Sequence, residues 1–448
     1  MNELPAVFQG TSSGEEVKTH LEFGFDIPEA IESLELVFEF APAIVQGTRN
    51  MVCLSLFDPE GFRGSGHRHG ARHHVQLDAV YATPGYLPGD LPAGRWRVLA
   101  HTHMIMPGEP LTYSLTIKAA AAPTTQPRPQ VSTSPPVLPE RGPGWYRGNL
   151  HAHSDHSDAS WTIEELVRDA ERRGLDFATL SDHNTVSGLA EMASRATPRL
   201  LTMGGVELTT FYGHALALGR RDWLDWTSEP MSALATQADA EGLFVIAHPR
   251  VQGDPVCTGC RWEYLALMPG PARALEVWNR GVWSDSNEEA LLLWYAWLNA
   301  GHRLVATAGT DAHGPAPEGS AVGLNVVYAE ALTEAAILKA VRDGHLYLSS
   351  GPLFELVARS ASGHEVRTGE VVSLPATLVL DYAEVPPGAR ARLVVNGLVA
   401  AQASLAGRER LELSVPVRAR WCVLELRAED GTMLALTNPI FTPAFVGD

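Results

Sequence analysis

The chain has little cysteine, no long apolar run and no basic run. Four cysteines in 448 residues are too few for a disulfide framework. No segment approaches the roughly 20 consecutive apolar residues of a membrane span. The start, MNELPAVFQG, also lacks the charged and apolar regions of a signal peptide. We therefore expect a cytoplasmic protein without a membrane partner.

Positive charge is also scarce, because 34 lysines and arginines stand against 52 aspartates and glutamates, a net charge of −18. A surface of this sign repels polyanions, and no basic run could follow a phosphate backbone. The sequence therefore argues against long nucleic acid as a partner. A mononucleotide stays open as a substrate.

Two of the cysteines, Cys257 and Cys260, form a CxxC pair. A structural zinc would need two further ligands of the same kind nearby, and no second pair follows. We interpret both as reduced thiols in a loop. A structural zinc and a redox pair remain the alternatives.

Proline gathers in one segment, AAAAPTTQPRPQVSTSPPVLPERGPG, where no apolar period survives, and we predict a linker over 120–144. A chain of this length is expected to form two or three domains. Short alternating runs such as LELVFEF predict an all-β, sandwich-like domain over 1–119. Runs of the same style predict a second one over 352–448.

The middle segment, 145–351, alternates apolar strand-like runs with amphipathic helical patterns. TIEELVRDAERRG carries apolar residues at helical spacing and ends at Gly174, and the strand-like FATL follows. Three further helix-then-strand pairs repeat the pattern. Such repeats predict parallel strands in a barrel or a doubly wound sheet.

Nearly every predicted strand of the middle segment ends in a residue that can bind a metal. The carboxyl ends of barrel strands converge on one face, and that face carries the site. Histidines two positions apart on a strand point the same way, so one ion can be bound by both. In chain order the candidates are His151, His153, Asp182, His183, Glu207, His214, His248, Glu276, Asp311 and His313.

Imidazole and carboxylate ligands without thiolate favour Zn, Mn or Fe. Two or three such ions lower the pKa of a shared water and hold an ester or phosphoryl oxygen, so the pattern predicts metal-assisted hydrolysis. Only six residues separate Glu207 from His214, and a helical crossover needs roughly ten to twelve. We therefore expect a tight connection between antiparallel strands at this point.

The motifs HAHSDHSD, SDH, GVE, GH, AHP and TDAH, in this order, resemble those of the polymerase and histidinol phosphatase (PHP) superfamily. The N-terminal β domain, the DPEG loop and EVWN make the chain most similar to the carbaryl-hydrolase-like (CehA/McbA) branch of metallohydrolases. The resemblance implies an α/β fold, a distorted (β/α)7 barrel flanked by the two sandwich-like domains.

The resemblance also implies a trinuclear centre with two or three divalent ions bound, Mn, Zn or Fe. It implies ligands to the first ion at His151, His153, Glu207 and Asp311, to the second at Glu207, His214 and His248, and to the third at Asp158, His183 and His313. Glu207, Asp311 and His313 are the expected catalytic residues among them. His156 matches no ligand of the family.

An arginine near the strand ends is the candidate for gripping a phosphate, because a guanidinium can hold two of its oxygens. We favour Arg250, two residues from His248, as a catalytic residue, with Arg280 and Arg261 as alternatives. The histidine-rich segment 66–74 is interpreted as a solvated loop. A lid over the barrel mouth is the alternative.

We predict a metal-dependent phosphoesterase that cleaves small phosphoesters, such as a nucleotide or a sugar phosphate, through a metal-activated water. Hydrolysis of a carbamate or carboxylic ester is the alternative suggested by the branch that the chain resembles. A non-catalytic binding scaffold would be marked by lost ligands, and none of the nine is lost. The acidic charge and the lack of a polymerase segment disfavour an exonuclease.

Overall fold

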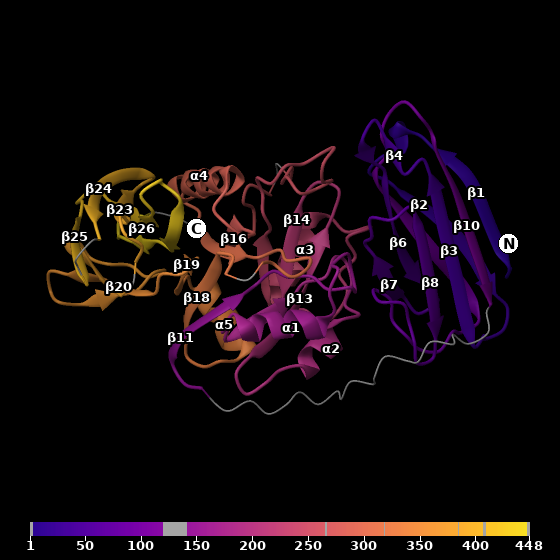
Figure 1. Ribbon diagram of the computed structural model, residues 1–448, viewed down its shortest axis with the longest axis horizontal. Coiled ribbons are helices and arrows are strands. Elements are labelled where there is room, and N and C mark those ends of the chain that lie inside the picture. Colours follow the sequence, from indigo (N-terminus) through magenta and orange to yellow (C-terminus); the bar gives the residue numbers. More distant parts are fainter. Residues whose placement is uncertain are drawn as a thin grey trace.

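The computed structural model describes residues 3–119, 141–264, 267–317, 319–383, 385–405 and 409–445 (Figure 1). The linker predicted over 120–144 lies outside these residues except for its end, Arg141–Gly144. Within the described ranges, no helix is long and apolar enough to cross a membrane.

Most of residues 3–119, the N-terminal unit, forms two four-stranded antiparallel sheets that share one apolar core. Their strand orders are β1-β10-β3-β8 and β2-β9-β6-β7. Successive side chains of a strand point to opposite faces of the sheet, and this explains the packing. In β3, Leu34, Leu36 and Phe38 are buried and alternate with less buried residues. The strands are β1 (Ala6–Ser12), β2 (His20–Ile27), β3 (Ser33–Ala41), β6 (Met51–Phe57), β7 (Phe62–Gly66), β8 (Arg72–Asp78), β9 (Gly94–Met104) and β10 (Leu111–Ala119), with a short hairpin of β4 (Ile44–Val45) and β5 (Thr48–Arg49).

The middle of the chain is a mixed α/β unit in which seven strands, β11 to β17, lie side by side in chain order. Most neighbours are parallel, but β14 is antiparallel to both β13 and β15. The expected tight antiparallel connection between Glu207 and His214 is thus confirmed. The strands are β11 (Gly144–Asn149), β12 (Phe177–Leu180), β13 (Leu201–Thr209), β14 (His214–Leu218), β15 (Leu243–Ile246), β16 (Ala274–Asn279) and β17 (Val305–Gly309).

The first and last strands of this run meet at their carboxyl ends. The backbone N–H of Asp311, just after β17, donates to the carbonyl of His151 at 3.0 Å, just after β11. The N–H of His153 donates to the carbonyl of Ala312 at 3.1 Å. The HAH and TDAH segments are therefore neighbours, although more than 150 positions apart.

Helices connect most of these strands. The predicted helix in TIEELVRDAERRG is confirmed as α1 (Ile163–Arg172), and a capping box between Thr162 and Glu165 starts it. Gly174 follows its end at a φ of 64°, a left-handed conformation that glycine adopts without strain. The other helices are α2 (Leu189–Ser194), α3 (Met231–Glu241), α4 (Asp285–Ala300) and α5 (Glu334–Arg342).

The sheet continues from β11 into the C-terminal part of the chain. It passes through β18 (Leu324–Ala329) and β19 (Leu346–Ser349) to β27 (Met433–Thr437), β26 (Trp421–Arg427), β23 (Arg390–Val395) and β24 (Leu398–Ser404), and β28 (Ile440–Phe441) pairs with β26. A second sheet holds β20 (Phe354–Ser360), β21 (Glu365–Val366), β22 (Ala376–Tyr382) and β25 (Arg410–Val415). The domain boundary predicted after residue 351 therefore separates β19 from β27, although these two strands are neighbours in one continuous sheet.

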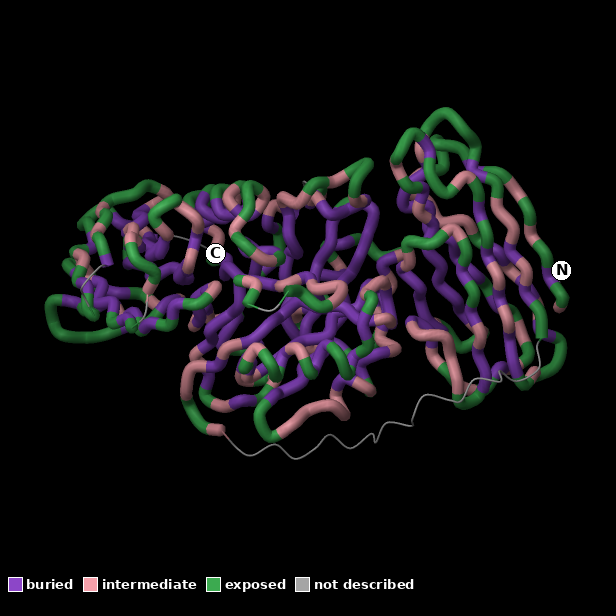
Figure 2. The backbone as a smooth tube through the Cα atoms, in the orientation of Figure 1, coloured by how far each residue is buried: buried purple, intermediate pink, exposed green. Residues whose placement is uncertain are grey.

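The N-terminal unit packs against the loops that follow β11–β17. Thr185 Oγ1 donates to the carbonyl of Gly85 at 2.7 Å, and Thr258 Oγ1 donates to that of His103 at 2.9 Å. Lys18 Nζ lies 2.7 Å from Asp254 Oδ2. Figure 2 shows the buried backbone running through the strands of both units. The contact between the units thus covers the face where the predicted ligands gather.

Candidate metal centre

The HxH pair lies where β11 ends. His151 and His153 are both fully buried, and their Nε2 atoms are 3.0 Å apart. Asp311 Oδ1 lies 3.1 Å from His153 Nε2 and 3.5 Å from His151 Nε2. Glu207 Oε2 lies 3.4 Å from each of these nitrogens. Ligands around a tetrahedral zinc lie about 3.3 Å apart, so these four donors have the spacing that one ion needs.

Glu207 extends this first group into a second. Its other oxygen, Oε1, is 3.2 Å from His214 Nδ1 and 3.1 Å from His248 Nε2. Both histidines are buried, and they come from β14 and from the end of β15. The two oxygens of one carboxylate thus face two sets of imidazoles, which is the arrangement of a bridging ligand.

A third group forms around Asp158. Its Oδ1 lies 3.1 Å from His313 Nε2 and 3.4 Å from His183 Nε2. Its Oδ2 lies 3.0 Å from Nε2 of His69, a residue of the N-terminal unit. The structure therefore gathers all nine ligands predicted from the sequence, and it adds one histidine from outside the middle segment.

Burial makes the charge balance of this centre unusual. Burial opposes charge on Glu207, yet the imidazoles of His183 and His151 hold the pKa of its carboxyl well below the usual range. Burial also opposes charge on His151, but Glu276 and Glu207 raise its pKa well above the usual value. The carboxylates therefore stay ionised although they are buried, and buried charges of this kind are paired or bind a metal ion.

Two carboxylate oxygens show that the residues fit a metal. Among the described residues, no donor with hydrogen-bond geometry is aimed at the buried Oε2 of Glu207 or Oδ1 of Asp158. Imidazole nitrogens nevertheless lie 2.8 to 3.4 Å from them. Buried polar atoms without partners are rare, and divalent cations held among the same nitrogens would satisfy both.

The carboxylate of Glu276 orients one of the ligands, His151, but does not belong to the three groups of ligands itself. It accepts from His151 Nδ1 at 3.1 Å, from the backbone N–H of His248 at 3.0 Å and from Asn279 Nδ2 at 3.1 Å. Nδ1 of His151 therefore donates to Glu276, and this orientation would present Nε2 to a bound ion. A side chain at Gly309 would collide with Glu276, since its Cβ would lie 1.9 Å from Oε1.

We expect Glu276→Gln to weaken metal affinity by about 10- to 100-fold, because the substitution removes the charge that supports the imidazole of His151. Metal titration followed by elemental analysis measures this. The exposed Glu355→Gln is the matched control and should bind metal normally. Unchanged affinity in Glu276→Gln would refute the supporting role.

Asp182 was a candidate ligand, but the structure places it elsewhere. It accepts from the backbone N–H and hydroxyl of Ser154, both at 2.7 Å, and from the hydroxyl of Ser157 at 2.6 Å. It therefore fixes the loop that carries Asp158. His156 lies against Ser187, with Nδ1 and Oγ 2.8 Å apart.

Arg250 does not line the metal centre. It borders a separate surface hollow with Arg261, because the chain turns away after His248 and pairs Arg250 with Arg261. Arg280 is the arginine from the middle segment that lines the cavity of the centre. Its Nε donates to Asp311 Oδ2 at 3.3 Å, and 62% of its side chain is exposed.

Strained backbone marks the ends of three consecutive strands. His248, Arg280 and Asp311 have φ values of 28°, 69° and 48°, a left-handed conformation that is unfavourable for residues other than glycine. They follow β15, β16 and β17. Such strain persists only where the surroundings fix it, and it gathers at functional sites.

The first part of the histidine-rich segment 66–74 closes over the centre, and its last part, from Arg72, lies in strand β8, so its interpretation as a solvated loop is wrong for both parts. His67 is 6% exposed, and its ring lies 4.5 Å from that of His183. His69 contacts Asp158. The sequence carried one signal, a second HxH spacing, but nothing in it connected this loop with the distant strand ends.

Cys257 and Cys260 form a disulfide, so the interpretation as reduced thiols is also wrong. Cys260 Sγ lies within 4.8 Å of ring nitrogens of both His214 and His248. The disulfide therefore forms part of the wall beside the second group of ligands.

A cavity of about 470 Å³ opens onto the centre between the two units. Arg49 and Met104 line it from the N-terminal unit, and His183, His313 and Arg280 line it from the middle. Its size suits a small molecule.

No family model and no curated protein matches the chain. Among solved structures, it is similar to a two-domain protein from Bacteroides vulgatus that contains a predicted PHP-like metal-dependent phosphoesterase. The two share 17% identity over 70% of this chain and 100% of the other, with a TM-score of 0.40. An amidohydrolase from Chromobacterium violaceum shares 17% identity over 38% of this chain and 88% of its own, with a TM-score of 0.29. Likenesses this weak carry no argument about function, which rests on the site.

Proposed function

We propose that the protein is a metal-dependent hydrolase of the PHP type that cleaves small phosphoesters. The single observation behind the proposal is Glu207, a buried carboxylate whose Oε1 faces His214 and His248 and whose Oε2 faces a separate set of histidines, namely His151, His153 and His183. We further propose that β11–β17 form the distorted seven-stranded barrel of that superfamily. The contact between the ends of β11 and β17 supports this closure.

The chain's own residues would hold two or three divalent ions, which supply a Lewis acid and an activated water when bound. Asp311 links the first and third groups, since His313 donates from Nδ1 to its backbone carbonyl at 2.8 Å. His69 adds a contact to the third group from the N-terminal unit. Asp311 and His313 also line the cavity, so a substrate there would meet the ions that these residues and Glu207 would hold.

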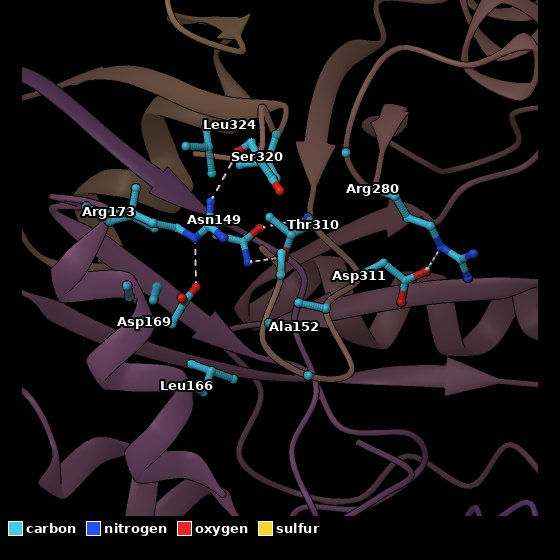
Figure 3. Close-up of a pocket in the computed structure, with 18 of the residues that line it drawn as sticks. Asn149, Ala152, Leu166, Asp169, Arg173, Arg280, Thr310, Asp311, Ser320 and Leu324 are labelled. Carbon is cyan, nitrogen blue, oxygen red and sulfur yellow. Dashed lines mark hydrogen bonds and ion pairs between the residues drawn. The ribbon is translucent and has the colours of Figure 1, made fainter. Parts of the chain in front are cut away.

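Arg280 takes the role that the sequence suggested for Arg250. Arg280 lines the cavity of the centre, and Figure 3 shows its guanidinium held by Asp311. A guanidinium there can bind two oxygens of a phosphate. The N-terminal unit covers the cavity, which supports a small ester and argues against long nucleic acid.

Hydrolysis of a carboxylic ester or carbamate is the second candidate, and one observation favours it. A cavity of about 380 Å³ lies beside Asp311 and Arg280 and is lined by Trp161, Leu166 and Leu324 (Figure 3). Such a lining suits an apolar leaving group.

A panel of esters with one common aryl leaving group tests the proposal. The phosphate monoester, the acetate and the carbamate are compared with added Mn²⁺ or Zn²⁺, alongside nucleotide and sugar phosphates. We expect the highest kcat/KM for phosphate monoesters. Turnover of the acetate or carbamate alone would establish the second candidate. A purified protein with less than one equivalent of metal and no turnover would point to a binding scaffold.

We expect Arg280→Ala to lower kcat/KM for the phosphate ester by about 10- to 150-fold, the worth of a hydrogen bond to a charged group. Metal content should stay unchanged, because Arg280 contacts Oδ2 of Asp311 and Oδ1 faces the imidazoles. Arg250→Ala is the matched control and should keep normal kinetics. Equal losses in both variants would contradict this assignment.

A further inference from the structure

A second cluster of metal-binding side chains lies in the N-terminal unit, outside the ligand set described above. Cys53 lies in β6, which runs between β7 and β9. His67 directly follows β7, and His103 lies in β9. One donor atom from each of the three lies within 4.8 Å of the other two. All three side chains are buried.

His103 is the second observation that points to a ligand. It is 1% exposed, and neither ring nitrogen has a hydrogen-bond partner among the described residues. Its neighbour His101 is equally buried, but its Nε2 lies 2.7 Å from Ser55 Oγ and its Nδ1 2.7 Å from His20 Nδ1. Both ring nitrogens of His101 thus have partners, whereas both ring nitrogens of the equally buried His103 lack one.

We propose that Cys53, His67 and His103 bind a zinc ion. Cys53 Sγ and His67 Nδ1 are 3.5 Å apart, close to the spacing of two ligands on one tetrahedral ion. One thiolate and two imidazoles are ordinary zinc ligands, and a water molecule completes the fourth position. Binding converts the thiol to a thiolate, and its proton goes to solvent.

The ion would fix the loop over the hydrolytic cavity. His67 and His69 are two residues apart, so an ion held by His67 anchors the backbone that places His69 against Asp158. This consequence rests on the proposed function, whereas the zinc site rests on its own three residues. A thiolate distinguishes the two, because the nine ligands of the hydrolytic centre include none.

Cobalt substitution in the full-length protein tests the site. We expect Co²⁺ to produce a thiolate-to-cobalt charge-transfer band in the near ultraviolet, in addition to the Co²⁺ that the hydrolytic centre takes up. Cys53→Ser should abolish the band and remove one equivalent of bound metal. Cys422→Ser, which replaces another buried free thiol, should retain it. His103→Gln, a milder change, should also lose the band, while His101→Gln should keep it.

Other outcomes overturn the proposal. These are a wild-type protein without the band, a folded Cys53→Ser variant that keeps it, and loss of the band in Cys260→Ser alone. The last result would show a reduced Cys260 and assign the thiolate to it, beside His214 and His248. Failure of hydrolysis with a normal band would refute the proposed function and leave the zinc site intact.

Discussion

Glu207→Gln is expected to lower kcat/KM by more than about 100-fold, beyond the 10- to 100-fold loss typical of residues that only support a ligand. Glutamine keeps the shape but replaces one anionic oxygen with an N–H donor. The NH2 group of the glutamine then takes the place of either Oε1 or Oε2 and points its hydrogens at imidazoles that lie within 3.4 Å. No rotation of the amide serves both groups, so the first two ions are affected together.

Metal content and kinetics measured on the same preparation check this prediction. We expect Glu207→Gln to lose more than one equivalent of metal, whereas Glu276→Gln should show weaker binding that excess metal restores. An exposed carboxylate of the same unit, in Glu263→Gln, is the control for the substitution itself. A Glu207→Gln variant with full metal content and normal turnover would contradict a bridging role.

Removal of the metals is expected to lower the stability of the fold strongly. A site loaded at 100 times its Kd contributes about 2.7 kcal/mol to the free energy of unfolding, and several sites add to this. When the ions leave, the carboxylates of Glu207, Asp158 and Asp311, whose side chains are at most 5% exposed, keep only the imidazoles as compensating charge. The ligands come from strand ends far apart in the chain, so the ions hold those ends together.

Thermal unfolding before and after chelation measures the effect. We expect the unfolding temperature to fall on chelation and to recover on addition of Mn²⁺ or Zn²⁺. Chelation of Glu207→Gln should cause a much smaller shift, because that variant holds less metal at the start. An unfolding temperature independent of metal in the wild-type protein would show that the centre is empty in solution.

The grouping of the candidate metal ligands was largely predictable because these residues stand at fixed places in a local pattern. A strand that ends in HAH presents both imidazoles to one side, and parallel strands bring their ends together. The short span from Glu207 to His214 likewise specified an antiparallel step, since too little chain is present for a helix. These are consequences of backbone geometry, which sequence spacing encodes.

The neighbours of the ligands could not be predicted in the same way. Arg250 stands closer in sequence to a ligand than Arg280 does to Asp311, but a left-handed turn after β16 brings Arg280 to the cavity. The sequence position of Glu276, at the end of a strand, is the same as that of a ligand, and only its contact with His151 Nδ1 gives it a different role. Sequence distance says nothing about which way a loop leaves its strand.

The sequence by itself determined the type of architecture. Strand-and-helix repeats fill the middle of the chain, with imidazoles and carboxylates at the strand ends, and segments with an alternating β pattern flank them. Only the tertiary structure decided that the N-terminal unit covers the centre. His67 and His69 reach His183 and Asp158 through the packing of one unit on another. That packing depends on the shapes of two complete surfaces, and no periodicity or spacing along the chain records it.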